Sequence, residues 1–192
     1  MSVDFEAGML AEADVVGWGG RIGAAAVGDD AGLPLVLALR GELGAGKSVL
    51  ARAIARGAGV TSPMPSPTFN LVFRYDGGGG IALYHVDLYR LNHADEVWEL
   101  GWREFGSGRQ IVLIEWPERA EALLPADRWD VWLSPTPRRG DVEGAAGRAR
   151  LRGQAGSGPE AGGGRAGSGA RDLRWVWGAR RGAVADIPGP EA

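Results

Sequence analysis

The sequence predicts an α/β fold in which helices flank a central mixed sheet. Segments 33–40 and 110–114 are short, continuous apolar runs, which are typical of strands buried within a sheet. Segment 47–56 places apolar residues along one face of a helix and is followed by glycines, which favour helix termination. Segments 69–75 and 81–87 flank a run of glycines, so they predict two antiparallel strands joined by a turn.

Further helices and a further strand are predicted around this central region. Apolar residues at helical spacing predict helices over 13–25 and 94–105. A short helix is predicted from Pro117 to Leu124, and segment 128–133 is predicted to be another strand. The order of strands and helices is therefore the alternating order of an α/β protein.

The C-terminal part of the chain has a different composition. Segment 154–170 is rich in glycine and contains no large apolar residue, so it cannot offset the entropy cost of ordering. We expect it to be a flexible loop inside a terminal hairpin whose strands are 148–152 and 172–177. Residues 187–192 are expected to form a loose tail. We expect a single domain over residues 1–192, because this length suffices to bury a core.

Composition bounds the class of protein. The chain has 192 residues, no cysteine and a formal net charge of -3, which argues against a broad nucleic-acid-binding surface. The first residues are acidic, and no apolar run approaches the roughly 20 residues that a membrane span requires. These features predict a soluble protein that is not exported and does not associate with a membrane.

Residues 41–48 carry the most specific motif in the chain. They match the pattern Gly-x-x-x-x-Gly-Lys-Ser/Thr and lie between a predicted strand and a predicted helix, as a nucleotide-phosphate-binding loop does. The chain contains 21 lysines and arginines together, and Lys47 is the only lysine. A compact ammonium suits phosphate at this position better than a planar guanidinium. The residues expected to bind the nucleotide are Glu42, Leu43, Gly44, Ala45, Gly46, Lys47 and Ser48.

Two carboxylates are candidates for a role in hydrolysis. Nucleotide hydrolysis requires an acidic residue near the phosphates, which holds magnesium or its waters. Glu115 follows the apolar run 110–114, and Asp87 ends the run 81–87, so both lie at carboxyl ends of predicted strands, where ligands bind in α/β sheets. The alternative for each is a solvated carboxylate at the end of a strand.

Three other residues are weaker candidates. Thr68 lies in a proline-rich segment, which is compatible with a switch that approaches the γ-phosphate and equally with a plain turn before a strand. His85 precedes Asp87 by two residues and shares its strand face, although a lone histidine more often packs or forms hydrogen bonds than takes part in catalysis. Trp116 follows Glu115 and requires no function at a sheet edge.

Four segments in series, 41–48, 66–69, 84–91 and 113–118, resemble the bacterial TsaE (YjeE) family. This family supplies the ATPase of the machinery that makes threonylcarbamoyladenosine (t6A) in tRNA. The resemblance implies a P-loop NTPase-like α/β fold, ATP and Mg²⁺ as ligands, and a cytoplasmic location. It also implies the partner proteins TsaD and TsaB, with tRNA reached only through their complex.

The resemblance also implies roles for individual residues. Lys47 would contact the phosphates, Ser48 and Glu115 would hold magnesium, Thr68 would belong to a switch-like segment, and Asp87 would support hydrolysis. Ser48 stands where the family mostly has threonine, which keeps the hydroxyl ligand. The glycine-rich region from about 141 to 170 is longer than the terminal hairpin usual in the family.

Other functions compatible with the loop are a small-molecule kinase and a nucleotide-dependent assembly module without turnover. A kinase requires a lid with arginines, and the glycine-rich surroundings of the C-terminal arginines make a poor lid. A GTPase is disfavoured, because its guanine-reading Asn-Lys-x-Asp motif requires a second lysine and the chain has none.

Overall fold

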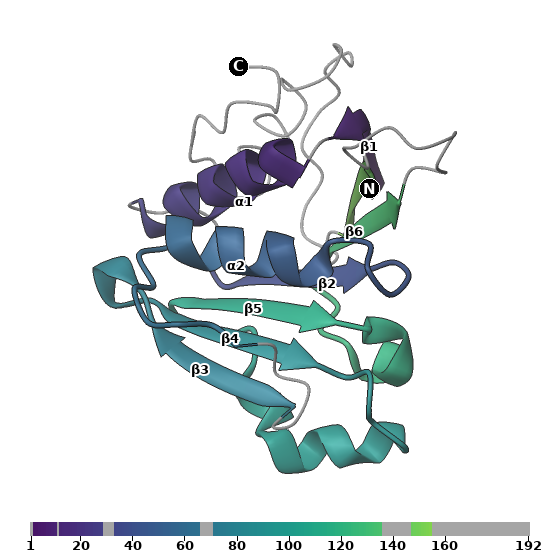
Figure 1. Ribbon diagram of the computed structural model, residues 1–192. Helices are drawn as coiled ribbons and strands as arrows, with labels where there is room; N and C mark the ends of the chain where they lie inside the picture. The colour runs from purple at the N-terminus through teal and green to yellow at the C-terminus, as the bar shows by residue number, and fades with distance from the viewer. Residues whose placement is uncertain (1, 11, 29–32, 66–70, 136–146, 155–192) are drawn as a thin grey trace.

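The computed structural model describes residues 2–10, 12–28, 33–65, 71–135 and 147–154 of the protein (Figure 1). Within these ranges, seven strands form one sheet in the order β1-β7-β6-β2-β5-β4-β3. The strands are β1 (Ser2–Leu10), β2 (Leu35–Arg40), β3 (Val72–Asp76), β4 (Ala82–Asp87), β5 (Gln110–Glu115), β6 (Arg128–Pro135) and β7 (Gly147–Gln154).

The sheet is mixed, as predicted. Strands β6, β2, β5 and β4 are parallel to their neighbours among these four, whereas β3, β7 and β1 pair antiparallel at the two sides. The predicted hairpin is formed by β3 and β4. In the register of the parallel strands, Glu115 at the end of β5 lies beside Asp87 of β4 and beside Leu39 of β2. The carboxyl ends of the three strands therefore meet at one edge of the sheet.

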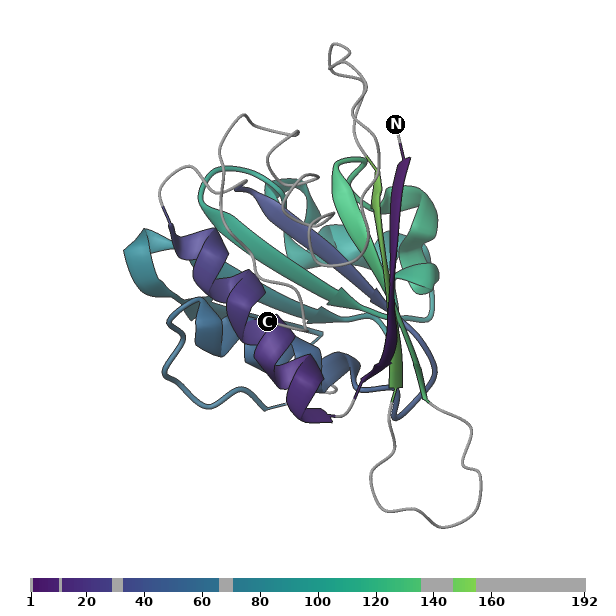
Figure 2. The same ribbon diagram turned by 90° about the horizontal axis from the view of Figure 1, so that it is seen from above.

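Two α-helices cover one face of the sheet: α1 (Glu12–Val27) and α2 (Lys47–Gly57) (Figures 1 and 2). They bury Trp18, Ile22, Leu50 and Ile54 against the central strands. The opposite face is covered by short 3-10 helices, η2 to η4, which bury a second cluster that includes Trp102. None of the helices in the described ranges is long and apolar enough to cross a membrane.

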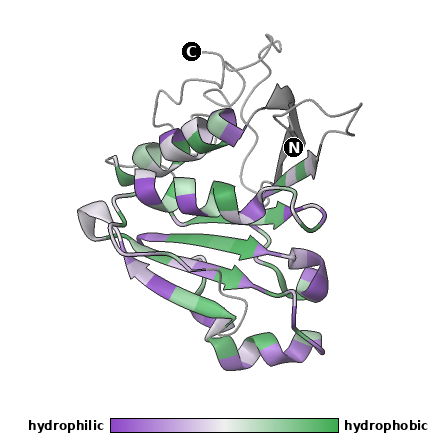
Figure 3. Cartoon of the chain, in the orientation of Figure 1, coloured by the Kyte–Doolittle hydropathy of each residue, from purple (hydrophilic) through white to green (hydrophobic). Residues whose placement is uncertain are grey.

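The central strands β2, β4 and β5 are hydrophobic along most of their length (Figure 3). Both faces of these strands are covered, so successive residues are buried on alternate sides of the sheet. In β5, Ile111 and Leu113 contact the cluster beneath α1 and α2, whereas Val112 and Ile114 belong to the opposite cluster. This explains why segment 110–114 is continuously apolar rather than alternating.

Glycines bring helices α1 and α2 into close contact. A Cβ atom added to Gly23 would lie 1.9 Å from the carbonyl oxygen of Ile54, and one added to Gly57 would lie 2.0 Å from the carbonyl oxygen of Gly20. The backbones therefore touch directly, and no larger residue fits at either position. A Cβ atom added to Gly20 itself would meet nothing within 4 Å.

We expect Gly23→Ala to lower the free energy of unfolding by about 1–3 kcal/mol, because the added methyl group overpacks the helix contact. Gly20→Ala is the matched control on the same helix. It should raise stability by about 0.5–1 kcal/mol through helix propensity, since its methyl group meets open space. Urea denaturation of both variants measures the difference. Equal effects of the two substitutions would contradict the close contact.

The helix predicted over 94–105 is interrupted. The structure has two 3-10 helices here, η2 (Ala94–Leu100) and η3 (Trp102–Glu104), separated by Gly101 in the left-handed region with φ 75°. This backbone conformation ends a helix, and glycine adopts it at little cost. The short helix predicted after Pro117 is present as η4 (Pro117–Leu123), again of 3-10 type. The remaining 3-10 helix, η1 (Gly78–Gly80), lies in the hairpin turn.

The predicted C-terminal hairpin is wrong in its pairing. The segment predicted as a strand over 148–152 forms β7, but β7 pairs with β6 on one side and with the unpredicted strand β1 on the other. Both edges of β7 are thus occupied. Gln154, the first residue of the predicted loop 154–170, is the last residue of β7, and the structure does not describe 155–170, 172–177 or the predicted tail 187–192.

Candidate nucleotide-binding site

The glycine-rich loop joins the end of β2 to the start of α2 (Figure 1). Gly41 opens the loop with φ 134°, and a Cβ atom there would lie 2.1 Å from the carbonyl oxygen of Leu133 in β6. Gly46 ends the loop with φ 95° and is the N-cap of α2, which has no side-chain cap. The loop is therefore seated tightly on the sheet at one end and leads into an uncapped helix N-terminus, where backbone N–H groups favour an anion.

Lys47 is folded back over this loop. Its Nζ atom donates hydrogen bonds to the carbonyl oxygens of Gly41 at 2.7 Å and Glu42 at 2.8 Å. The same Nζ atom lies 3.8 Å from the centre of the Trp116 ring, in a cation–π contact. Burial lowers the pKa of Lys47, and the nearby charge of Glu115 opposes that shift. The only lysine of the chain is thus a buried cation held at the centre of the loop.

Glu115 lies under the start of α2, where β5 ends. The Ser48 hydroxyl donates a hydrogen bond to Glu115 Oε2 at 2.9 Å, and His85 Nε2 lies 2.7 Å from Glu115 Oε1. The Glu115 residue is only 2% exposed. A hydroxyl and a carboxylate in contact, beside an anion-binding loop, are the oxygen ligands that Mg²⁺ prefers.

Asp87 lies next to Glu115 in the sheet register. Its Oδ1 atom accepts a hydrogen bond from the Tyr89 N–H at 2.9 Å. Burial raises the pKa of Asp87, and the like charge of Glu115 raises it further, while the Tyr89 hydrogen bond and the charge of Lys47 act in the opposite direction. A carboxylate with a raised pKa is a better proton acceptor than an ordinary aspartate.

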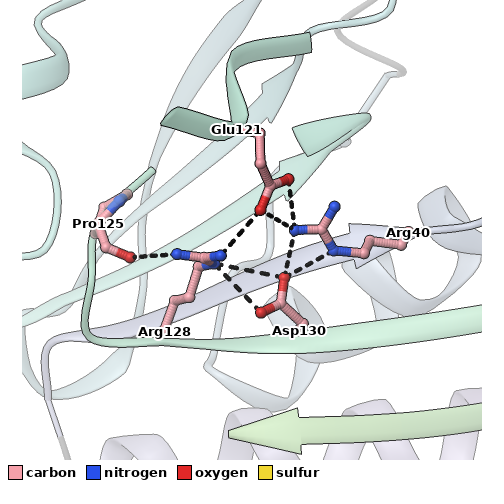
Figure 4. Close-up of polar contacts among 5 residues, drawn as sticks. All are labelled: Arg40, Glu121, Pro125, Arg128 and Asp130. Atoms are coloured by element: carbon pink, nitrogen blue, oxygen red, sulfur yellow. Dashed lines mark hydrogen bonds and ion pairs between the residues drawn. The ribbon is translucent and has the colours of Figure 1, made fainter. Parts of the chain in front are cut away.

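An ion-pair network holds the base of the loop (Figure 4). Arg40, which immediately precedes the loop, donates to Asp130 from Nε at 2.7 Å and contacts Glu121 of η4 at 2.8 Å through Nη2. Arg128 donates to the same Glu121 at 3.1 Å and to the Pro125 carbonyl oxygen at 3.1 Å, and its Nε lies 3.3 Å from Asp130 Oδ2. The network therefore joins β2, β6 and the η4 segment that follows Glu115.

Comparison with known families identifies the chain. A family model described as "Threonylcarbamoyl adenosine biosynthesis protein TsaE" matches residues 11–140, which is more than half of the 192 residues. The chain belongs to the TsaE family. The matched region contains the loop, Ser48, Asp87 and Glu115, so it includes the whole of the site described above.

Several relatives carry the name tRNA threonylcarbamoyladenosine biosynthesis protein TsaE. The Bacillus subtilis protein is 39% identical over 108 residues, which are 56% of this chain and 65% of that protein. The Haemophilus influenzae protein is 40% identical over 91 residues, 47% of this chain and 57% of its own length. A Nostoc protein is 44% identical over 88 residues, 44% of this chain and 53% of its own length. The chain thus spans between half and two thirds of these relatives.

A solved structure shows the same fold. The crystal structure of Bacillus subtilis YdiB superimposes with a TM-score of 0.56 at 21% sequence identity, and the match covers 81% of this chain and 87% of that one. The predicted α/β fold of P-loop NTPase type, with a central mixed sheet flanked by helices, is confirmed.

The structure brings most of the predicted TsaE site residues together. Lys47 and Ser48 lie at the start of α2, and Asp87 and Glu115 lie at adjacent strand ends. Glu42 and Leu43 are exposed in the loop. Thr68 lies outside the residues that the structure describes. Among the described residues, no three side chains of histidine, aspartate or glutamate gather as a metal site, so Mg²⁺ would also require oxygens from the nucleotide and water.

Two features of the site were not predicted. The sequence placed His85 on the same strand face as Asp87, but only the β4–β5 pairing shows that it contacts Glu115. The network around Arg40 has no signal in the sequence. Its acidic members, Glu121 and Asp130, lie 81 and 90 residues from Arg40 along the chain, so the register of β2 and β6 and the position of η4 bring them together.

Asp87→Asn should stabilise the protein at neutral pH. Because the pKa of Asp87 is raised in the folded state, folding binds a proton between the unfolded pKa, near 3.8, and the higher folded pKa. The contribution of Asp87 to stability therefore falls as pH rises through this window, and it then stays constant. Asparagine retains the acceptor for the Tyr89 N–H and removes the buried charge.

The stability difference between Asp87→Asn and the wild type should thus be small at about pH 3 and reach its full value by about pH 8. Thermal unfolding across this pH range measures it. Asp76→Asn is the matched control, since Asp76 is exposed on β3. A difference that is greatest in acid would contradict the raised pKa.

Proposed function

We propose that this TsaE protein is a Mg²⁺-dependent ATPase that acts in t6A modification of tRNA together with TsaD and TsaB. The observation that carries the proposal is the contact of Ser48 with Glu115 directly beneath the Lys47 loop. It joins a phosphate-binding element to a pair of magnesium ligands, which is the combination that phosphoryl transfer requires. The printed names of the relatives support the pathway.

In this proposal the loop residues from Glu42 to Ser48 bind the phosphates through their backbone N–H groups. Lys47 exchanges its hydrogen bonds with the Gly41 and Glu42 carbonyl oxygens for bonds to the terminal phosphates. Ser48 and Glu115 hold Mg²⁺, which when bound neutralises charge on the phosphate oxygens.

Asp87 and Thr68 complete the proposed site. Asp87 supports hydrolysis by orienting the attacking water and accepting its proton, a role to which its raised pKa is suited. Thr68 belongs to a switch-like segment that responds to the γ-phosphate. TsaD and TsaB are the proposed partners in the cytoplasm, and contact with tRNA occurs through their complex.

Hydrolysis of ATP by the purified chain, with and without the TsaD and TsaB proteins of the same organism, tests the proposal. We expect weak turnover alone and faster turnover in the complex, both abolished by a chelator. Omitting the chain should also prevent sustained t6A formation. Tight ATP binding without turnover under either condition would favour an assembly module, and transfer of labelled phosphate to a small molecule would favour a kinase.

A further inference from the structure

His85 is a buried polar residue whose role the proposed function does not specify. It lies on β4, two residues before Asp87, and is 0% exposed. A fully buried imidazole in the centre of a sheet is costly unless it forms a hydrogen bond. The partner it contacts is not an inert group but Glu115, the proposed magnesium ligand.

The two oxygens of the Glu115 carboxylate have different partners. Oε1 lies 2.7 Å from His85 Nε2 on the sheet side, and Oε2 accepts the Ser48 hydroxyl at 2.9 Å on the loop side. Because a carboxylate accepts hydrogen bonds, His85 carries its proton on Nε2 and donates it. His85 Nδ1 is buried and has no hydrogen-bond partner among the described residues, as suits the unprotonated nitrogen of a neutral ring.

Strand register sets this contact. Asp87 pairs with Glu115, and His85 pairs with Leu113. His85 is therefore a diagonal neighbour of Glu115, because it lies on the adjacent strand two residues before the residue that pairs with Glu115. His85 and Asp87 project from the same face, two residues apart. This face is the one that α2 and Ser48 cover. The imidazole therefore contacts the carboxylate from the side away from the glycine-rich loop, which lies at the carboxyl ends of the strands.

We infer that His85 is the positioning residue for Glu115: it holds Oε1 and so presents Oε2 alone to Ser48 and the magnesium. The inference rests on the proposed function. Without the imidazole, the terminal torsion of the Glu115 side chain is soft and the carboxylate can rotate away from the metal. Residues that orient a metal ligand in this way typically change metal affinity or activity 10–100-fold when removed.

Two substitutions of His85 distinguish positioning from packing. Glutamine can place an amide N–H near the position of Nε2, whereas the shorter asparagine reaches only the position of Nδ1. We expect His85→Asn to weaken the Mg²⁺ dependence of ATP binding by about 10–100-fold, and His85→Gln to restore most of it. ATP binding in the presence of a chelator should be unchanged in both variants, because Lys47 and the loop are intact.

Equal losses in the asparagine and glutamine variants, or an equal loss with the chelator present, would show that His85 only packs and would overturn the inference. An unchanged Mg²⁺ dependence in His85→Asn would overturn it as well. Thermal unfolding establishes that each variant is folded. The comparison uses binding, so it does not depend on turnover.

A second measurement needs neither nucleotide nor a substitution of His85. The chain has two histidines, and His93 is exposed at the start of η2, so the ring nitrogen signals of His85 are readily assigned by NMR. Glu115→Gln should shift the Nε2 signal of His85, while Glu118→Gln, a matched change at an exposed position nearby, should not. A His85 signal indifferent to Glu115→Gln would refute the contact. If the wild type binds no ATP, the proposed function fails, whereas this signal still decides whether His85 holds Glu115.

Discussion

Lys47→Ala is expected to lower the affinity for ATP by about 100-fold or more and to abolish hydrolysis. Nζ forms two hydrogen bonds to loop carbonyl oxygens, and in the proposed complex those bonds pass to phosphate oxygens. Each charged hydrogen bond contributes about 1.5–3 kcal/mol, so the loss of two corresponds to 10²-fold or more in affinity. The chain has no second lysine to replace it.

Arg56→Ala is the control for Lys47→Ala. It removes one positive charge from the last turn of the same helix, where the side chain is exposed and distant from the loop. Calorimetric titration with ATP and Mg²⁺ measures both affinities. Nucleotide affinity that is equal in the two variants, or t6A levels in cells that are unchanged by Lys47→Ala, would remove the basis of the proposed function.

Asp130→Ala is expected to cause the largest loss of stability, about 3–5 kcal/mol. The Asp130 side chain is 3% exposed and contacts both Arg40 and Arg128, whose side chains are 14% and 8% exposed. Removal of the carboxylate leaves the two guanidinium groups largely buried, with the half-exposed Glu121 as the remaining acidic partner in the network. An uncompensated buried charge costs far more than the loss of a surface ion pair.

Glu121→Ala is the matched control, because Glu121 contacts the same two arginines from a side chain that is 50% exposed. Its substitution should cost less than about 1 kcal/mol, since water solvates the remaining charges. Guanidinium chloride also screens ion pairs, so urea denaturation is the appropriate measurement. Similar losses in the two variants would show that the network acts as a surface cluster rather than as a buried one.

Local patterns in the sequence predicted most of the elements that support the site. Three features depend only on residues close together in the chain: the apolar runs of β2 and β5, the helical spacing of α2 and the glycine-lysine motif. They can therefore be predicted without a structure. The alternation of Val3, Phe5, Ala7 and Met9 with smaller or polar residues is also a strand signal. Strand β1 is nevertheless absent from the predicted elements.

Pairing between distant segments was less predictable. The predicted C-terminal hairpin paired 148–152 with 172–177, but β7 pairs with β6, the strand before it, and with β1, about 145 residues away. The helix over 94–105 followed its apolar spacing, yet one glycine in the left-handed region divides it. In both cases a non-local contact or a single backbone angle outweighed local propensity.

In the candidate site too, the positions of the residues were predictable from the sequence, but their contacts were not. The motif around Lys47 and the strand-end positions of Asp87 and Glu115 follow from residue order, because each carboxylate comes directly after the apolar residues of its strand. The contacts of Glu115 with Ser48 and His85, and of Arg40 with Asp130, follow only from strand register and helix placement. Hydrogen bonds depend on distances of a few tenths of an ångström, and only the packed sheet determines those distances.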